Sequence, residues 1–136
     1  MRLLAIDYGK KRCGIAVSDP LQIIANALTT VSSDELIPFL NNYFKQEQVS
    51  TIVLGYPLGL DNQATDSTAK VEKLYLRLKR LYADKEIVYW DERYTSKMAQ
   101  QALIQSGMRK SKRRQKHIID EVSATIILQE YMESRK

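Results

Sequence analysis

The sequence predicts an α/β protein, a mixed β-sheet flanked by helices, in one domain spanning residues 1–136. Two apolar runs near the start are separated by a short turn with glycine, which is typical of an antiparallel hairpin. Later apolar runs alternate with longer amphipathic patterns, which is typical of parallel strands joined by helical crossovers. A chain of this length usually forms one domain, so we expect both parts to share one sheet.

The first half of the chain is expected to hold three strands and one helix. The opening run, LLAID, is nearly all apolar, as central strands are, and the run GIAVS follows the turn YGKKR. Ser33 or Asp34 is expected to cap the helix, which continues to about Gln48. The strands are expected at Leu3–Asp7, Gly14–Ser18 and Asn26–Val31. The apolar face of the helix is formed by Leu36, Ile37, Leu40, Tyr43 and Phe44.

The second half is expected to hold two strands and three helices. The run TIVL reads as a buried strand and is followed by GYPLGLDN, a loop rich in Gly and Pro. The two strands are expected at Thr51–Leu54 and Glu86–Asp91. The helices are expected at about 64–82, from Thr95 or Ser96 to about 107, and at about 117–134. The apolar stripe of the first of these helices is formed by Val71, Leu74, Leu78, Leu81 and Tyr82.

The net charge of +5 is concentrated in one segment. Residues 109–116, RKSKRRQK, contain six cations and no anion, whereas the rest of the chain carries 15 basic and 16 acidic residues. Such a segment is either a solvated loop or a contact for the phosphate backbone of a nucleic acid. The single cysteine, Cys13, excludes an intramolecular disulfide, and no Cys/His cluster suggests zinc. No signal peptide and no membrane-length apolar run is apparent, so we expect a cytoplasmic protein.

Acidic residues recur where the predicted strands end. Asp7 ends the first strand, and Asp91 and Glu92 end the last one. Because sites in α/β sheets gather at the carboxyl ends of the strands, these residues are expected at one edge. Strand side chains alternate between faces, so only one of Asp91 and Glu92 can point to a given face. Asp120 shares a helical stripe with Ala124, Ile127 and Tyr131, which predicts that it faces the sheet.

Carboxylates that converge repel each other unless a cation lies among them. A set of oxygen ligands without His or Cys suits Mg²⁺ or Mn²⁺. Each residue also has a simpler interpretation: Asp7 caps the turn, Asp91 or Glu92 pairs with Arg93, and Asp120 favours the start of its helix. Together, and with a basic segment just before Asp120, they indicate a metal-dependent site that acts on phosphodiesters.

The turn after Asp7 is flanked by Gly9 and Gly14, and glycine permits positive φ or a close approach of the backbone. Arg12 has the bidentate fork that suits a phosphate group. The alternative is a plain hairpin with solvated cations. The residues expected to contact nucleic acid are Gly9, Arg12, Gly14, Arg93, Arg109, Lys110, Lys112, Arg113, Arg114 and Lys116.

Four motifs resemble those of the YqgF family, also called the RuvX or pre-16S rRNA nuclease family, in the RNase H-like superfamily. The first is D-x-G-x-x-R-x-G-x-A, which begins at Asp7. The second is G-x-P at 55–57, with Asp61 after it. The third is D-E-R-x-T-S at 91–96, and the last is the helix DEVSATIIL at 120–128. Their order and spacing span essentially the whole chain.

The resemblance implies an RNase H-like fold with a five-stranded mixed sheet. It also implies a nuclease site in which Asp7, Glu92 and Asp120 hold two Mg²⁺ or Mn²⁺ ions, with Asp91 as the alternative to Glu92. The family is linked to processing of the 5′ end of pre-16S rRNA. The implied partners are therefore pre-16S rRNA and the ribosomal particle, and the chain would act as a monomer or a homodimer.

Other functions remain open. The first is a Holliday junction resolvase, by similarity to the RuvC resolvases, and the second is a non-catalytic RNA-binding factor in ribosome assembly. RuvC-type resolvases carry a second aspartate one turn into the final helix, where this chain has Ser123. They also take an acid from the fourth strand, which here ends in LGYP without one. These departures weaken the resolvase hypothesis more than the nuclease hypothesis. An actin-like ATPase would need two such domains.

Overall fold

The computed structural model describes residues 1–9, 11–56, 66–91 and 116–135, without the side chains of residues 66, 67 and 116–120. The strands are β1 (Arg2–Tyr8), β2 (Arg12–Ser18), β3 (Ala25–Ser32), β4 (Val49–Tyr56) and β5 (Glu86–Asp91). The helices are η1 (Ser33–Glu35), α1 (Leu36–Gln46), α2 (Asp66–Leu81) and α5 (Lys116–Ser134). None of the described helices is long and apolar enough to cross a membrane.

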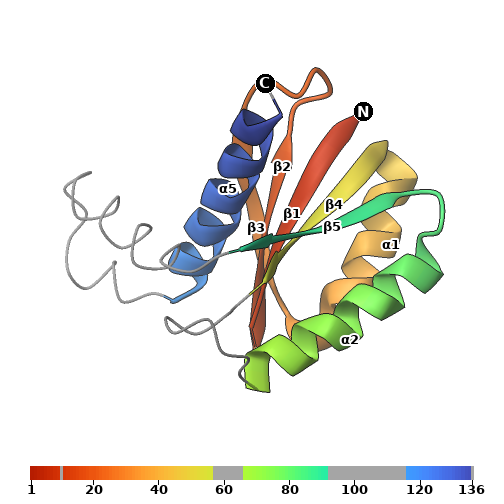
Figure 1. Cartoon of the computed structure of the whole chain (residues 1–136), viewed down its shortest axis with the longest axis vertical. Coiled ribbons are helices and arrows are strands. Elements are labelled where there is room, and N and C mark those ends of the chain that lie inside the picture. The colour runs from red at the N-terminus through yellow and green to blue at the C-terminus, as the bar shows by residue number, and fades with distance from the viewer. Residues whose placement is uncertain (10, 57–65, 92–115, 136) are drawn as a thin grey trace.

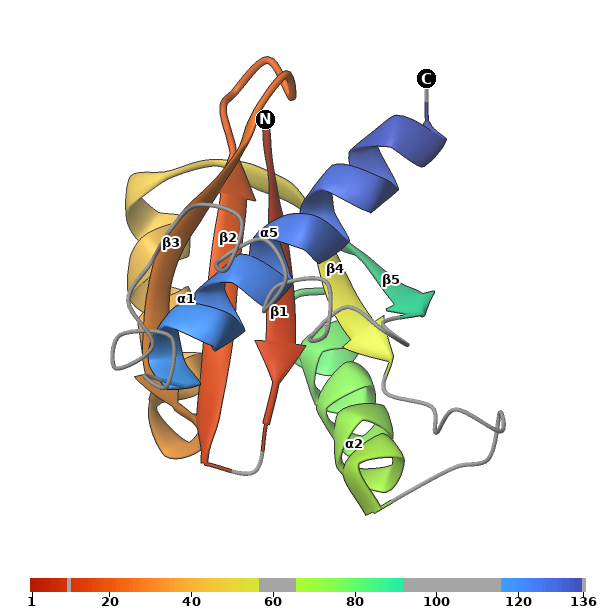
Figure 2. The same ribbon diagram turned by 90° about the vertical axis from the view of Figure 1, so that its left-hand side faces the viewer.

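The strands form one mixed sheet in the order β3-β2-β1-β4-β5. β2 pairs antiparallel with both β1 and β3, whereas β1, β4 and β5 run parallel. Helices α1 and α2 cover one face, and α5 crosses the other (Figure 1). The arrowheads of β1 and β4 point down in Figure 2, toward the end of the molecule at which α2 and α5 begin. The predicted mixed five-stranded sheet is therefore confirmed.

The core between the sheet and α1 and α2 is built from large aliphatic side chains. Leu4 and Ile6 of β1 are fully buried there, as are Ile52 and Leu54 of β4. Each such side chain contributes about 1.5–3 kcal/mol when it leaves water. The helices supply Leu36, Leu40, Val71, Leu74 and Leu78 to this core.

The core beneath α5 uses smaller side chains. Ala5, Ala16 and Ala124 are completely buried, so the helix can approach the strands closely. The ring of Trp90 in β5 meets that of Tyr131 edge-on at 6.0 Å, and its indole N–H donates to Glu130 at 3.3 Å. These contacts fix the position of α5 relative to β1 and β5.

Two differences from the predicted elements concern their ends. β4 continues past the expected end at Leu54, because Gly55 and Tyr56 pair with the last two residues of β5. The helix after β3 opens with the 3-10 turn η1, and its N-cap side chain makes no capping bond. The Ser33 hydroxyl instead donates to the carbonyl oxygen of Gly9 at 2.7 Å, which ties η1 to the β1–β2 turn.

One residue of the predicted apolar stripe of α2 is misplaced. Leu81 is 47% exposed, whereas the other four stripe residues are buried. Leu81 is the last residue of α2, and Tyr82 fills the core position beside it. The Tyr82 hydroxyl donates to Asn41 of α1 at 2.7 Å, and its ring meets Phe44 edge-on. The helix expected at about 95–107 lies outside the described residues.

Candidate active site

Asp7 lies near the carboxyl end of the central strand, on the face that α5 covers. Leu3 and Ala5, at the two preceding alternate positions of β1, both pack in the core beneath α5. Side chains alternate along a strand, so Asp7 shares their face. It pairs in register with Gly14 of β2, and its side chain is half-buried. The central strand thus presents a carboxylate at the edge where sites of α/β sheets form.

Asp91 ends β5 on the opposite face of the sheet. Val88 and Trp90 pack toward α5, whereas Ile87 belongs to the core with α1 and α2. Tyr89 stacks on Tyr75 of α2 at 4.3 Å. Asp91 is two residues further along and therefore shares the face of Tyr89. The structure does not bring Asp91 to the face of Asp7, and Glu92 lies outside the described residues.

The start of α5 lies at the same side of the molecule as the end of β1 (Figure 2). Residue 120 lies in the second turn of this helix, one turn before Ala124, which is buried against the sheet. The predicted stripe of Ala124, Ile127 and Tyr131 is buried beneath α5. The backbone therefore places position 120 over the face that carries Asp7, and the Asp120 side chain lies outside the described part.

Ser123 supplies a second polar group beneath α5. Its side chain is 1% exposed, and its hydroxyl has no hydrogen-bond partner among the described residues. Glu130 lies seven residues further along the same side of α5 and accepts the bond from Trp90, so this side faces β5. A buried hydroxyl without a partner costs about 1–3 kcal/mol, which water or an ion would offset. Sequence reasoning treated Ser123 only as the absence of an aspartate.

These groups fit a hard divalent cation. Among the described side chains, no three His, Cys, Asp or Glu residues gather closely enough to hold a metal. Asp7 and Ser123 present oxygen atoms on this face, and oxygen ligands suit Mg²⁺ or Mn²⁺. Cys13, whose thiol would favour softer metals, is buried in the core on the other face.

Gly9 shapes the turn that follows Asp7. Its N–H donates to the carbonyl oxygen of Arg12 at 2.9 Å, and a Cβ at this position would lie 2.7 Å from that oxygen. Its own carbonyl accepts the bond from Ser33. The backbone that comes close to Gly9 is therefore that of Arg12, in the same turn. Gly14 pairs with Asp7 and Thr30 inside the sheet, and Arg12 begins β2 with a half-buried side chain.

Most of the predicted nucleic-acid contacts lie outside the described residues. This holds for Arg93 and for five of the six cations of the basic segment, Arg109, Lys110, Lys112, Arg113 and Arg114. The sixth, Lys116, is the first residue of α5, and its side chain is not among those described. Their roles stay predictions.

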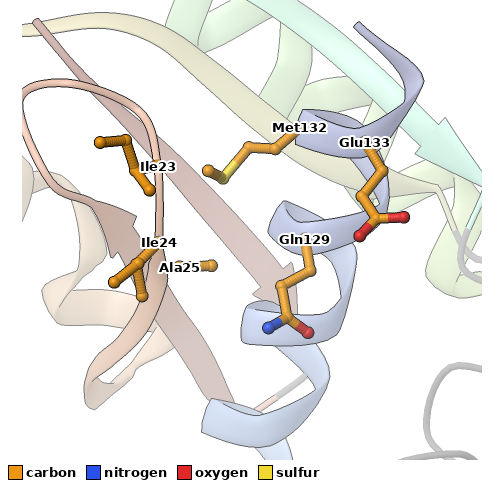
Figure 3. Close-up of a pocket in the computed structure, with 6 residues that line it drawn as sticks. All are labelled: Ile23, Ile24, Ala25, Gln129, Met132 and Glu133. Carbon is orange, nitrogen blue, oxygen red and sulfur yellow. The ribbon is translucent and has the colours of Figure 1, made fainter. Parts of the chain in front are cut away.

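Two hollows were not expected from the sequence. One, of about 300 Å³, lies between β1 and α2 and is lined by Tyr8, Lys70, Lys73, Leu74 and Arg77. The signal was present in the helical spacing of the three cations. The other, of about 160 Å³, lies between the start of β3 and the end of α5, where Ile23 and Ile24 face Gln129, Met132 and Glu133 (Figure 3). This hollow lies at the other end of the strands from Asp7.

Comparisons with known proteins agree with this architecture. Two relatives, from Bacteroides fragilis and Flavobacterium psychrophilum, are both named "Putative pre-16S rRNA nuclease". The first is 46% identical and covers 99% of this chain and 98% of its own. The second is 47% identical and covers 96% of each chain.

Two solved structures share the fold at low identity. The fowlpox virus resolvase in complex with its substrate Holliday junction DNA has a TM-score of 0.62 at 14% identity, over 99% of both chains. RuvC of T. thermophilus in complex with a Holliday junction substrate has a TM-score of 0.59 at 13% identity, over 99% of this chain and 95% of that one. The predicted RNase H-like fold is thus confirmed. A family model described as "RuvX: Holliday junction resolvase" matches residues 1–134, and the chain therefore belongs to this family.

Proposed function

We propose that this protein is a metal-dependent nuclease that hydrolyses phosphodiester bonds of pre-16S rRNA near its 5′ end, in the cytoplasm. The observation that carries the proposal is the position of Asp7 at the carboxyl end of β1, on the face where α5 begins. The names of the relatives from Bacteroides fragilis and Flavobacterium psychrophilum support pre-16S rRNA as the substrate.

The proposed metal ligands are Asp7, Glu92 and Asp120. Asp91 lies on the opposite face, so we assign the ligand role in the D-E-R motif to Glu92, for which the strand's period of two predicts the face of Asp7. Two divalent ions, when bound, supply Lewis-acid activation of water and charge compensation at the leaving oxygen. Without such cations, three converging carboxylates would repel each other, which gives the site its affinity for them.

The chain's own residues orient the substrate. Asp7 is held by a strand with neighbours on both sides, so its carboxylate has a fixed position at the sheet edge. Arg12, Arg93 and the basic segment 109–116 are proposed to hold the phosphate backbone, because guanidinium and ammonium groups donate charge-assisted hydrogen bonds to phosphate oxygens. Ser123, whose buried hydroxyl has no partner among the described residues, is proposed to donate this hydroxyl to the same site.

The test is cleavage of a transcript that contains the 5′ extension of 16S rRNA, with and without Mg²⁺. Asp7→Asn and Glu92→Gln are expected to lower the cleavage rate by a factor of 100 or more while the circular dichroism spectrum stays unchanged. The matched control is Asp91→Asn, which removes the same charge one residue away and is expected to cleave like the wild type. Undiminished cleavage by Asp7→Asn would show that the site is assigned wrongly.

A Holliday junction resolvase is the second candidate, favoured by the description of the family model and by the fold of the two resolvases. This function needs two active sites on one junction and hence a homodimer. Paired nicks in a synthetic four-way junction, in the absence of rRNA cleavage, would support it. RNA binding that survives loss of Asp7, Glu92 and Asp120, without cleavage under any metal, would support a non-catalytic assembly factor.

A further inference from the structure

The hollow between β1 and α2 lies at the same sheet edge as Asp7 but on the other face. Tyr8 lines it and directly follows Asp7 in β1, so the two side chains point to opposite faces. Leu74 forms an apolar part of its wall and is 7% exposed. α2 begins near the carboxyl ends of the parallel strands (Figure 1). A strand of nucleic acid that crosses this edge would therefore meet both the hollow and Asp7.

The charged lining of this hollow is entirely positive. Lys70, Lys73 and Arg77 recur at i, i+3 and i+7, which places them along one side of α2. All three are exposed, and within the described residues none has a carboxylate at ion-pair distance. They extend over about 10 Å of the helix axis, at 1.5 Å per residue. Each strand of a duplex carries a phosphate about every 3.4 Å along its axis, so this length matches about three phosphates.

Glu72, the acidic residue of α2 whose side chain is described, lies on the other side of the helix. Glu72 accepts a hydrogen bond from Tyr56 at 3.4 Å, next to the aromatic stack of Tyr89 and Tyr75. It therefore belongs to the side of α2 that faces β4 and β5 and does not line the hollow. Tyr8 lines the hollow, and its phenol hydroxyl is a group that can donate a hydrogen bond.

We propose that this hollow, lined by Tyr8, Lys70, Lys73 and Arg77 and called the groove from here on, binds the phosphate backbone of a nucleic-acid strand. The bound part of the strand would lie next to the part that reaches Asp7. The inference rests on the proposed function, since it takes the substrate to be a nucleic acid. A merely solvated helix side would carry cations without a hollow between them. Here the three cations and a neutral hydroxyl donor surround one groove, which is the arrangement that a phosphate chain needs.

The test compares two triple variants with the same loss of charge. Lys70→Gln, Lys73→Gln and Arg77→Gln together remove the groove cations. Lys45→Gln, Lys79→Gln and Arg80→Gln together remove three exposed cations that do not line the groove. Binding of a fluorescein-labelled single-stranded oligoribonucleotide is measured by anisotropy in EDTA, at several salt concentrations.

The groove variant is expected to bind at least ten times more weakly than the control variant. The slope of log K against log salt is expected to fall by about 2, since each phosphate contact on a single strand contributes about 0.7. Arg77→Lys keeps the charge and is expected to stay near the wild type. Equal affinities and equal salt slopes for the two triple variants would overturn the proposal.

The outcomes separate this proposal from the nuclease assignment. If the groove variant loses affinity while the wild type never cleaves RNA with Mg²⁺, the groove stands and the nuclease assignment fails. If the wild type cleaves and the groove variant binds like its control, only the groove proposal fails. If the wild type binds no RNA at all, both fail. Thermal unfolding of both triple variants confirms that each is folded.

Discussion

The turn after Asp7 depends on the absence of a side chain at Gly9. A Cβ there would lie 2.7 Å from the carbonyl oxygen of Arg12, which is closer than real contacts of this kind. Gly9→Ala is therefore expected to lower the free energy of unfolding by about 1–3 kcal/mol, the usual cost of overpacking. Urea unfolding followed by circular dichroism measures this. The control is Lys11→Ala in the same turn, whose exposed side chain should change stability by less than about 0.5 kcal/mol. A Gly9→Ala protein as stable as the wild type would contradict this account of the turn.

The buried hydroxyl of Ser123 beneath α5 can be tested by removing a single oxygen atom. Because its buried hydroxyl has no partner among the described residues, Ser123→Ala should leave the free energy of unfolding unchanged or raise it by about 1 kcal/mol. In the proposed site, the same change should raise the Mg²⁺ concentration needed for half-maximal cleavage.

The control for Ser123 is Thr125→Ala on the same helix. The Thr125 hydroxyl already donates to the carbonyl oxygen of Glu121 at 2.8 Å, so its loss should not alter the Mg²⁺ requirement. If Ser123→Ala destabilises the protein and leaves the Mg²⁺ requirement unchanged, the hydroxyl has a structural partner and no part in the site.

The choice between Asp91 and Glu92 shows what one sequence can decide at residue scale. The motif supplies both acids, and strand alternation says only that they point to opposite faces. Which face belongs to which acid depends on the packing of Val88 and Trp90 against α5, a contact between segments far apart in the chain. The structure assigns Asp91 to the face of α1 and α2, and this narrows the choice.

An aromatic cluster joins α2 to β4 and β5 through Tyr75, Tyr56 and Tyr89, and Tyr89 has a strongly raised pKa. Burial raises the pKa of Tyr89 to about 12, and the nearby Glu72 carboxylate and Tyr56 add to the shift. The folded state therefore keeps its proton at pH values where the unfolded chain, with a pKa near 10, has lost it. The stability that Tyr89 contributes is fully present below about pH 10 and is lost as the pH rises toward 12.

Tyr89→Phe removes this titration and is expected to lose less stability than the wild type between pH 10 and 12. Tyr8, Tyr43, Tyr56 and Tyr82 have raised pKa values as well, so some of the loss remains. Urea unfolding at pH 8 and at about pH 11 measures the difference, and the pH 8 comparison isolates the effect on packing. Parallel losses in both proteins would contradict the role assigned to burial of Tyr89.

The sequence was most informative about the interiors of elements and least about their ends. The apolar run that predicts a strand at Glu86–Asp91 is β5 in the structure, where Ile87 is buried in the core. β4 extends through Gly55 and Tyr56 because β5 offers them partners, and such pairing is invisible in a local pattern. Leu81 fits the helical stripe but lies at the end of α2, where Tyr82 fills the core.

At the scale of the whole molecule, the two faces of the sheet are proposed to contact different parts of one substrate. Asp7 and the start of α5 lie on one face, and the groove of Tyr8, Lys70, Lys73 and Arg77 lies on the other. Only the proposed site of Asp7, Glu92 and Asp120 would hold the reacting phosphate. The groove would touch parts of the strand that do not change during the reaction, so its binding energy is the same in the ground state and the transition state.

This separation predicts distinct kinetic effects on RNA cleavage. The groove triple variant should raise KM about as much as it weakens RNA binding and leave kcat within a factor of two or three, because uniform binding is lost. Asp7→Asn should lower kcat and leave RNA affinity in EDTA nearly unchanged. When the groove substitutions are combined with Asp7→Asn in one protein, they should weaken RNA binding by the same factor as they do alone. The effects of substitutions at sites without shared partners add to within about 0.5 kcal/mol. A groove variant that instead lost kcat at unchanged KM would mean that the groove positions the reacting phosphate itself, and that the two faces of the sheet form one site.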